Sequence, residues 1–259
     1  MRHEYIYWHS DAFHQSARWG CACHALAETL CAEGYNATLI APDETGAGFF
    51  RTPRCPVWCI PARGAQSLPA LVTQRVGEIR QAVRSHSFDV LHAQDPISAN
   101  ALADLVQEGR ITGFARTVHH LDSFDHPELA ARQERGFMAA TELLSVSSLW
   151  KNILQDRHGR TAPVVGNGVD PAKFSPHPDK QDSALRVRYH LPADRRLILS
   201  VGGSSTARIP CCYWRCFWLS VRSSRTFIWS WRAGPHFWTI PPAGPHSRPV
   251  CGPAGWLIM

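Results

Sequence analysis

Residues 89–119, DVLHAQDPISANALADLVQEGRITGFARTVH, contain a strand, a helix and a second strand in close succession. Residues 89–93 are a short apolar run typical of a buried strand. Residues 97–107 predict a helix, and residues 114–119 predict the next strand. Two strands joined through a helix pair in parallel, because antiparallel neighbours are usually joined by a short hairpin. This stretch therefore predicts the α/β class.

The same alternation continues toward both ends of the chain. Strand patterns recur at residues 5–8, 37–41, 57–60, 143–146, 164–165 and 197–201, and helix patterns at residues 21–33, 68–84, 127–141 and 148–156. Such alternation predicts a doubly wound, Rossmann-like parallel sheet with helices on both faces. We expect this domain to cover residues 1–190. Residues 191–203 would supply the first strand of an incomplete second domain, and residues 204–259 an aberrant tail of low order.

The net positive charge of the chain comes entirely from the tail. The 259 residues include 27 Lys and Arg against 21 Asp and Glu, but residues 204–259 contain six Arg and no Lys, Asp or Glu. The remaining chain is balanced, so its charge gives no support to nucleic-acid binding. Nine Cys, an odd number in a large chain, favour reduced thiols. No apolar run is long enough to span a membrane and no secretory signal is visible, so we expect a cytoplasmic protein.

The tail also differs from the body in its residue types. Six of the ten Trp and four of the nine Cys fall in residues 204–259. This mixture, without acidic residues, is unusual for a folded surface, and neither a helical nor a strand period persists in it. Our hypothesis is that the tail is translated out of frame. The nucleotide sequence over codons 195–260, compared in three frames, tests it.

Several common site motifs are missing. No G-x-G-x-x-G follows the first strand, since Gly46-Ala47-Gly48 precedes Phe49 rather than a helix. No P-loop and no G-x-S-x-G elbow occur either. Residues 21–24 (CACH) lie in a predicted helix, where side chains two apart point away from each other. The Cys and His residues are therefore interpreted as structural, and we expect no metal.

Candidate ligand-binding residues follow the predicted strands, where parallel sheets hold their ligands. His119, His120 and Asp122 come after residues 114–118, Asp95 comes after residues 89–93, and Asn167 occupies a Gly-Asn-Gly turn. An imidazole at such an edge can donate a hydrogen bond to a ligand, and Asp122 can orient it. The alternative interpretation is a solvated loop without a chemical role.

Four stretches together resemble bacterial family-four glycosyltransferases of the GT-B fold. Residues 89–100 resemble the strand and helix that precede the family's histidine loop, and Thr117-Val118-His119 matches its Thr-x-His signature. Residues 167–176 resemble its N-G-V-D-x-x-x-F-x-P segment, and residues 201–203 resemble the strand that opens its second domain. The resemblance covers residues 1–203.

The resemblance implies two Rossmann-like domains facing each other across a cleft, with the acceptor on the N-terminal side and a nucleotide-sugar donor on the other. It implies retaining sugar transfer of the hexosyltransferase type, without a cofactor or a metal, to an unidentified sugar or lipid acceptor. A peripheral membrane contact is left open, and no nucleic acid is expected. His119 would be catalytic. The implied acceptor-side or substrate-binding residues are Gly20, Asp95, His120, Asp122 and Asn167, and Gly202 and Gly203 are the implied donor-side remnant.

The chain also departs from the family pattern. The family places an Arg, a Lys and later two Glu after the Gly-Gly strand, whereas this chain has no Lys after Lys180 and no acidic residue after Asp194. Trp19 replaces the first glycine of the pair that ends at Gly20. We therefore expect the donor site to be missing and the chain to be inactive alone. The first alternative is a non-catalytic acceptor- or glycan-binding module. A nucleic-acid or membrane binder acting through the tail ranks last.

Overall fold

A computed structural model of the chain describes the backbone of residues 4–8, 18–44, 46, 53–172, 176–177, 180–189, 196–201, 227–233, 236–240, 250–251 and 257–258. The side chains described are those of residues 23–44, 46, 53–172, 176–177 and 180–189. Two compact units make up the chain, Met1–Asp170 and Pro171–Met259. The predicted domain limits at residues 190 and 203 stay predictions.

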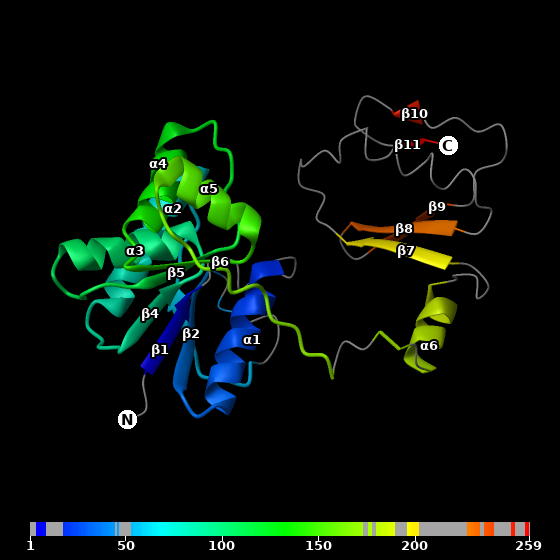
Figure 1. Ribbon diagram of the computed structural model, residues 1–259, viewed down its shortest axis with the longest axis horizontal. Coiled ribbons are helices and arrows are strands. Elements are labelled where there is room, and N and C mark those ends of the chain that lie inside the picture. Colours follow the sequence, from blue (N-terminus) through cyan, green and yellow to red (C-terminus); the bar gives the residue numbers. More distant parts are fainter. Residues whose placement is uncertain are drawn as a thin grey trace. The chain divides into compact units, whose positions relative to one another are not determined.

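The first unit is built on a six-stranded sheet (Figure 1). All its neighbouring strands are parallel, and their order is β3-β2-β1-β4-β5-β6. The strands are β1 (Glu4–Trp8), β2 (Asn36–Asp43), β3 (Val57–Pro61), β4 (Val90–Ala93), β5 (Ala115–Val118) and β6 (Glu142–Ser145). This order confirms the predicted doubly wound sheet, since the chain winds outward from β1 to β3 and then from β4 to β6 on the other side.

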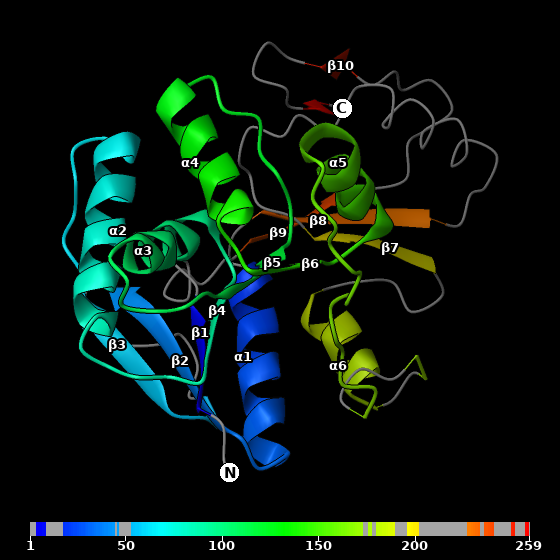
Figure 2. The ribbon, with the colours of Figure 1, turned by 60° about the vertical axis from the view of Figure 1, so that its left-hand side comes forward.

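Helices cover both faces of this sheet. They are α1 (Arg18–Ala32), α2 (Leu68–Val83), α3 (Pro96–Gln107), α4 (Pro127–Met138) and α5 (Ser148–His158). Because parallel crossovers are right-handed, reversing the winding direction moves the later helices to the opposite face. Figure 2 shows this arrangement, with α1 on one side of the sheet and α2, α3 and α4 together on the other.

The ends of several helices follow from their sequences. Ser67, Asp95 and Ser147 cap α2, α3 and α5 through their side-chain oxygens, and proline stands in the first turn of α2, α3 and α4. Gly159 ends α5 with φ 64°, a left-handed conformation that favours glycine. The predicted helix at residues 127–141 ends earlier, at Met138, because residues 141 and 142 hydrogen-bond to the Phe114 carbonyl instead.

Two apolar clusters form the core of the first unit. A small one lies between α1 and β2 and includes Cys23, Ala27 and Leu39. The larger one combines residues of the sheet with residues of α2, α3 and α4, among them Ile79 and Leu105. Its last member along the chain is Ala162. A parallel bridge between Ser145 and Val164 carries the chain past the end of β6, where the sequence predicts a short strand.

The second unit contains α6 (Lys180–Arg188) and a sheet of order β7-β8-β9. Strand β7 (Arg196–Val201) agrees with the strand predicted at residues 197–201, and it pairs in parallel with β8 (Phe227–Ala233). β9 (His236–Ile240) is antiparallel to β8, and β10 (Val250–Cys251) is antiparallel to β11 (Leu257–Ile258). The residue pattern did not predict α6 or the strands beyond residue 204. The low order expected of the tail as a whole stays a prediction.

Within the part of the chain that the structure describes, no helix is long and apolar enough to cross a membrane.

Candidate functional site

The carboxyl ends of β4 and β5 bring two buried polar side chains together. Gln94 follows the last residue of β4, and His119 follows the last residue of β5. The Gln94 Oε1 atom lies 2.8 Å from His119 Nε2. Only 5% of Gln94 and 8% of His119 are exposed. The sheet reverses its strand order between β1 and β4, so this pair lies next to the place where doubly wound sheets bind ligands.

A second hydrogen bond lies two residues earlier on the same strands. His92 Nε2 is 2.8 Å from Thr117 Oγ1, and both side chains are buried. The strand register connects Leu39 through Tyr7 to His92, and Leu39 packs on α1. Because side chains alternate along a strand, both hydrogen bonds lie on the face that α1 covers.

His92 is uncharged at neutral pH. Burial lowers the pKa of His92 to about 4, because the charged imidazolium loses its hydration inside the protein. Its hydrogen bond to Thr117 is therefore a contact between two neutral groups, beneath the Gln94–His119 pair. This second pair supports the site from within the sheet.

Asp95 is engaged in the start of α3. Its Oδ1 accepts hydrogen bonds from the backbone N–H groups of Ile97 at 2.8 Å and Ser98 at 2.9 Å. This N-cap satisfies donors that the first turn of a helix leaves unpaired. The predicted role of Asp95 in substrate binding stays a prediction. Its neighbour Gln94 is the residue that is hydrogen-bonded to His119.

The loop after His119 is held to α4 through backbone atoms. Gln133 Oε1 accepts from the Asp122 N–H at 2.9 Å, and Gln133 Nε2 donates to the Asp122 carbonyl at 2.9 Å. The Asp122 carboxylate contacts His120 Nε2 at 3.0 Å, where both side chains are well exposed. The structure therefore pairs Asp122 with His120. His120 directly follows His119, the residue that the resemblance implies to be catalytic.

Gly20 and Asn167 also belong to segments at the carboxyl edge of the sheet. Gly20 belongs to the first turn of α1, not to a loop before it, and a helix that follows β1 begins at the carboxyl edge of the sheet. Asn167 is exposed, three residues past Val164. Gly166 adopts a positive φ of 66°, as the turn predicts, whereas Gly168 does not. Gly202 and Gly203 lie outside the described residues.

Arg116 is a buried cation that the sequence analysis did not single out. It precedes Thr117 in β5 but points to the opposite face of the sheet, where its Nη1 occupies the space that a Cβ atom at Gly136 of α4 would take. It is 1% exposed, and among the described residues its Nε and Nη1 have no hydrogen-bond partner. Burial lowers the pKa of Arg116 to about 10, and the Asp95 carboxylate opposes this shift. A charged residue inside an apolar strand was the signal in the sequence.

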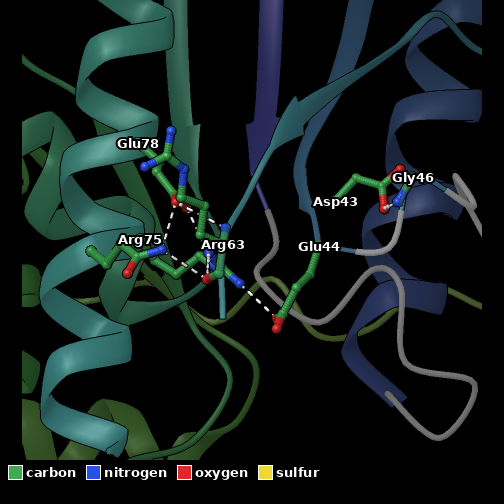
Figure 3. Close-up of polar contacts among 7 residues, drawn as sticks. Asp43, Glu44, Gly46, Arg63, Arg75 and Glu78 are labelled. Carbon is green, nitrogen blue, oxygen red and sulfur yellow. Dashed lines mark hydrogen bonds and ion pairs between the residues drawn. The ribbon is translucent and has the colours of Figure 1, made fainter. Parts of the chain in front are cut away.

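A second buried arginine ties the ends of β2 and β3 to α2 (Figure 3). Arg75 of α2 binds Glu44 at 2.8 Å and Glu78 at 2.6 Å, and its Nη1 also donates to the Arg63 carbonyl at 2.8 Å. Asp43, just before Glu44, accepts from the Gly46 N–H at 2.8 Å. These partners neutralise Arg75, so this cluster fixes the loops at the edge of the sheet and leaves no positive charge on Arg75 for an anionic ligand.

The structure describes four thiols of the first unit, Cys23, Cys31, Cys55 and Cys59, and none of these four is in a disulfide. Burial, with a smaller contribution from Asp43, raises the pKa of the Cys59 thiol above its ordinary value, which disfavours the reactive thiolate. Within the described ranges, no group of three His, Cys, Asp or Glu could hold a metal ion.

Comparisons with known proteins agree with this architecture. Residues 20–168 match the family described as a glycosyl transferase 4-like domain. A comparison with curated protein sequences found no match.

Three solved structures illustrate the shared fold. Sucrose-phosphate synthase from Thermosynechococcus elongatus is 14% identical with a TM-score of 0.60, over 88% of this chain and 70% of that chain. WaaG, a glycosyltransferase involved in lipopolysaccharide biosynthesis, is 10% identical with a TM-score of 0.62, over 87% and 62%. Anabaena Alr3699/HepE, solved with UDP and glucose, is 12% identical with a TM-score of 0.62, over 88% and 60%. This chain therefore spans only part of the length of these structures.

Proposed function

Since the chain belongs to the glycosyl transferase 4-like family, we propose that its first unit is the acceptor side of a retaining glycosyltransferase that uses a nucleoside-diphosphate sugar. The observation that carries the proposal is the placement of His119, buried and hydrogen-bonded to Gln94, at the ligand-binding edge of a doubly wound sheet. The family match includes both of these residues.

In this reaction the bond between the anomeric carbon and the diphosphate oxygen breaks, and a bond to an acceptor oxygen forms on the same face of the sugar. The acceptor proton leaves with the diphosphate. His119 would contact the sugar through its imidazole. Charge develops on the leaving diphosphate, so cationic groups supply much of the stabilisation in such a step.

We further propose that this chain does not complete the reaction alone. It has no Lys after Lys180, so the Lys that holds the donor diphosphate in the family pattern has no counterpart after residues 201–203. Each such contact contributes on the order of a few kcal/mol to transition-state stabilisation in a site without water. The same observation favours the second candidate function, a glycan- or acceptor-binding module without chemistry.

Turnover measurements test the catalytic part of the proposal. The purified chain is incubated with UDP-, GDP- and ADP-sugars, and release of the nucleoside diphosphate is measured. We expect no release above that of buffer. Efficient turnover would contradict the proposed inactivity and would show that the tail supplies the missing cations.

Binding measurements test the acceptor side. The chain is applied to a glycan array alongside the variants His119→Ala and His86→Ala, the latter changing an exposed histidine after α2. We expect binding that His119→Ala weakens and His86→Ala does not change. Equal binding by all three proteins would contradict a site at His119.

A further inference from the structure

Gln94 holds His119 through a hydrogen bond that is shielded from water. The two residues are separated by 25 positions in the sequence and meet only because β4 and β5 are neighbours. Both side chains are more than nine-tenths buried. A hydrogen bond in such surroundings is electrostatically stronger than one on the surface, so it can set the orientation of the ring.

The chemistry of the amide determines what this contact does to the imidazole. The oxygen of a carboxamide accepts hydrogen bonds and cannot donate them. Because Oε1 faces His119 Nε2, that ring nitrogen carries the proton, and the acceptor nitrogen of the neutral ring is Nδ1. The contact therefore selects one of the two tautomers and one ring orientation.

The pair below it differs in this respect. His92 Nε2 contacts the Thr117 hydroxyl at the same distance of 2.8 Å, but a hydroxyl can donate or accept and its hydrogen rotates freely. Thr117 therefore accommodates either tautomer of His92. The two cross-strand pairs have similar burial and spacing, and only the upper one fixes a tautomer.

Two further features fit a role beyond stability for Gln94. Its Nε2 is buried, and among the described residues it has no hydrogen-bond partner. A buried donor without a hydrogen bond reduces stability. A residue selected for stability alone would therefore not bury such a donor. In addition, the Asp95 cap on α3 fixes the backbone next to Gln94, from which the amide side chain extends.

We propose that Gln94 is a positioning residue that holds His119 in the Nε2–H tautomer and in one ring orientation at the carboxyl edge of the sheet. The meaning of this role in sugar transfer rests on the proposed function, whereas the state of the ring does not. The proposal can therefore be tested without a substrate.

The test is NMR of the full chain with 15N-labelled histidine, assigned with a His119 variant. In the unchanged protein we expect a protonated Nε2 and an unprotonated Nδ1 at pH 8, with a slowly exchanging Hε2 signal close to the Gln94 side chain. Protonation of Nδ1, or an Hε2 that exchanges as fast as in a free peptide, would overturn the proposal.

Two variants at position 94 separate positioning from packing. Gln94→Met keeps the length of the side chain without the acceptor, and we expect the protected Hε2 signal to disappear. Gln94→Glu restores an acceptor with a charge, so we expect the signal to return and the pKa of His119 to rise by at least about one unit. A packing role alone would not produce this rise.

Thr117→Val is the matched control. It removes the hydrogen bond to His92 from the same strand, two residues before His119. We expect the His92 signals to change and the His119 Hε2 signal to remain. Loss of the His119 signal in this control, or its survival in a folded Gln94→Met variant, would overturn the proposal. Failure of every sugar to bind would instead bear on the proposed function alone.

Discussion

Two buried arginines in the first unit show how partners decide the effect of a charge. Arg75 and Arg116 are both more than nine-tenths buried. Arg75 binds two glutamates and a backbone carbonyl. For Arg116, burial lowers the pKa, and the charged group that opposes this shift is the Asp95 carboxylate. A buried cation without close partners costs stability, because its hydration is lost and little replaces it.

Replacement of each arginine by methionine should therefore have opposite effects. We expect Arg116→Met to leave the free energy of unfolding unchanged or to raise it by about 1–2 kcal/mol. We expect Arg75→Met to lower it by about 2 kcal/mol or more, because Glu78 loses its cation while largely buried. Urea unfolding at pH 7 measures both. A larger loss for Arg116→Met than for Arg75→Met would contradict this interpretation.

His92 should make the first unit sensitive to acid. Its pKa is about 4 in the folded protein and 6.5 as a free side chain, so between these values the unfolded chain binds a proton that the folded chain does not. Stability is therefore lost as the pH falls from 6.5 toward 4, by about 3 kcal/mol at the lower end, and does not change above 6.5 for this reason.

The measurement compares the unchanged protein with His92→Gln, which keeps a hydrogen-bonding group beside Thr117 but does not titrate. Urea unfolding at pH 4 and pH 7 should show the acid loss reduced by that amount in the variant. Equal losses in the two proteins would mean that other groups cause the acid sensitivity.

At the level of elements, close packing between α4 and β5 depends on a glycine. A Cβ atom at Gly136 would collide with Arg116 Nη1 and lie 3.2 Å from the Ala99 Cβ of α3. Gly77 of α2, by contrast, has open space around the same position. Close packing therefore requires glycine at position 136, whereas it does not at position 77.

Alanine substitution should separate them. Gly77→Ala should raise stability by about 0.5–1 kcal/mol, which is the helical preference of alanine over glycine. Gly136→Ala should lower stability by about 1–3 kcal/mol, since overpacking exceeds that gain. The loss should shrink when Arg116→Met is also present, and a double-mutant cycle by urea unfolding measures this coupling. If Gly136→Ala lowers stability equally with and without Arg116→Met, the collision with Arg116 is not the cause of the loss.

The elements that could be predicted from sequence are those with an apolar pattern. The runs around β2, β4 and β5 are short and apolar because both faces of a central parallel strand are covered. Helix α6 was missed because its nine residues have no buried position, so no apolar period marks it. The contact between Gln94 and His119 could not be predicted for a different reason. Strand order brings the two residues together, and no local pattern in the sequence records that order.

At the scale of the whole molecule, the buried core of the first unit ends before its last residue, Asp170. Every described core residue falls between Cys23 and Ala162. Domains with their own apolar core can fold alone. We therefore expect a fragment of residues 1–170 to unfold cooperatively, with a midpoint within about 4 °C of the corresponding transition of the full chain.

A shorter fragment is the control for this prediction. Residues 1–141 lack β6 and α5 and with them the core residues Leu143, Leu154 and Ala162, so this fragment should not show a cooperative transition. Circular dichroism during heating measures both fragments. A non-cooperative transition for residues 1–170 would mean that the second unit contributes to the stability of the first.

The two hydrogen bonds between Gln133 and Asp122 involve only backbone atoms of Asp122 and not its side chain. The side chain at position 122 can therefore be exchanged while both backbone contacts with Gln133 are kept. Natural variation or a designed library can change the chemical group that position 122 presents, and the helix that holds the loop need not change. A new side chain at this position would therefore cost little stability.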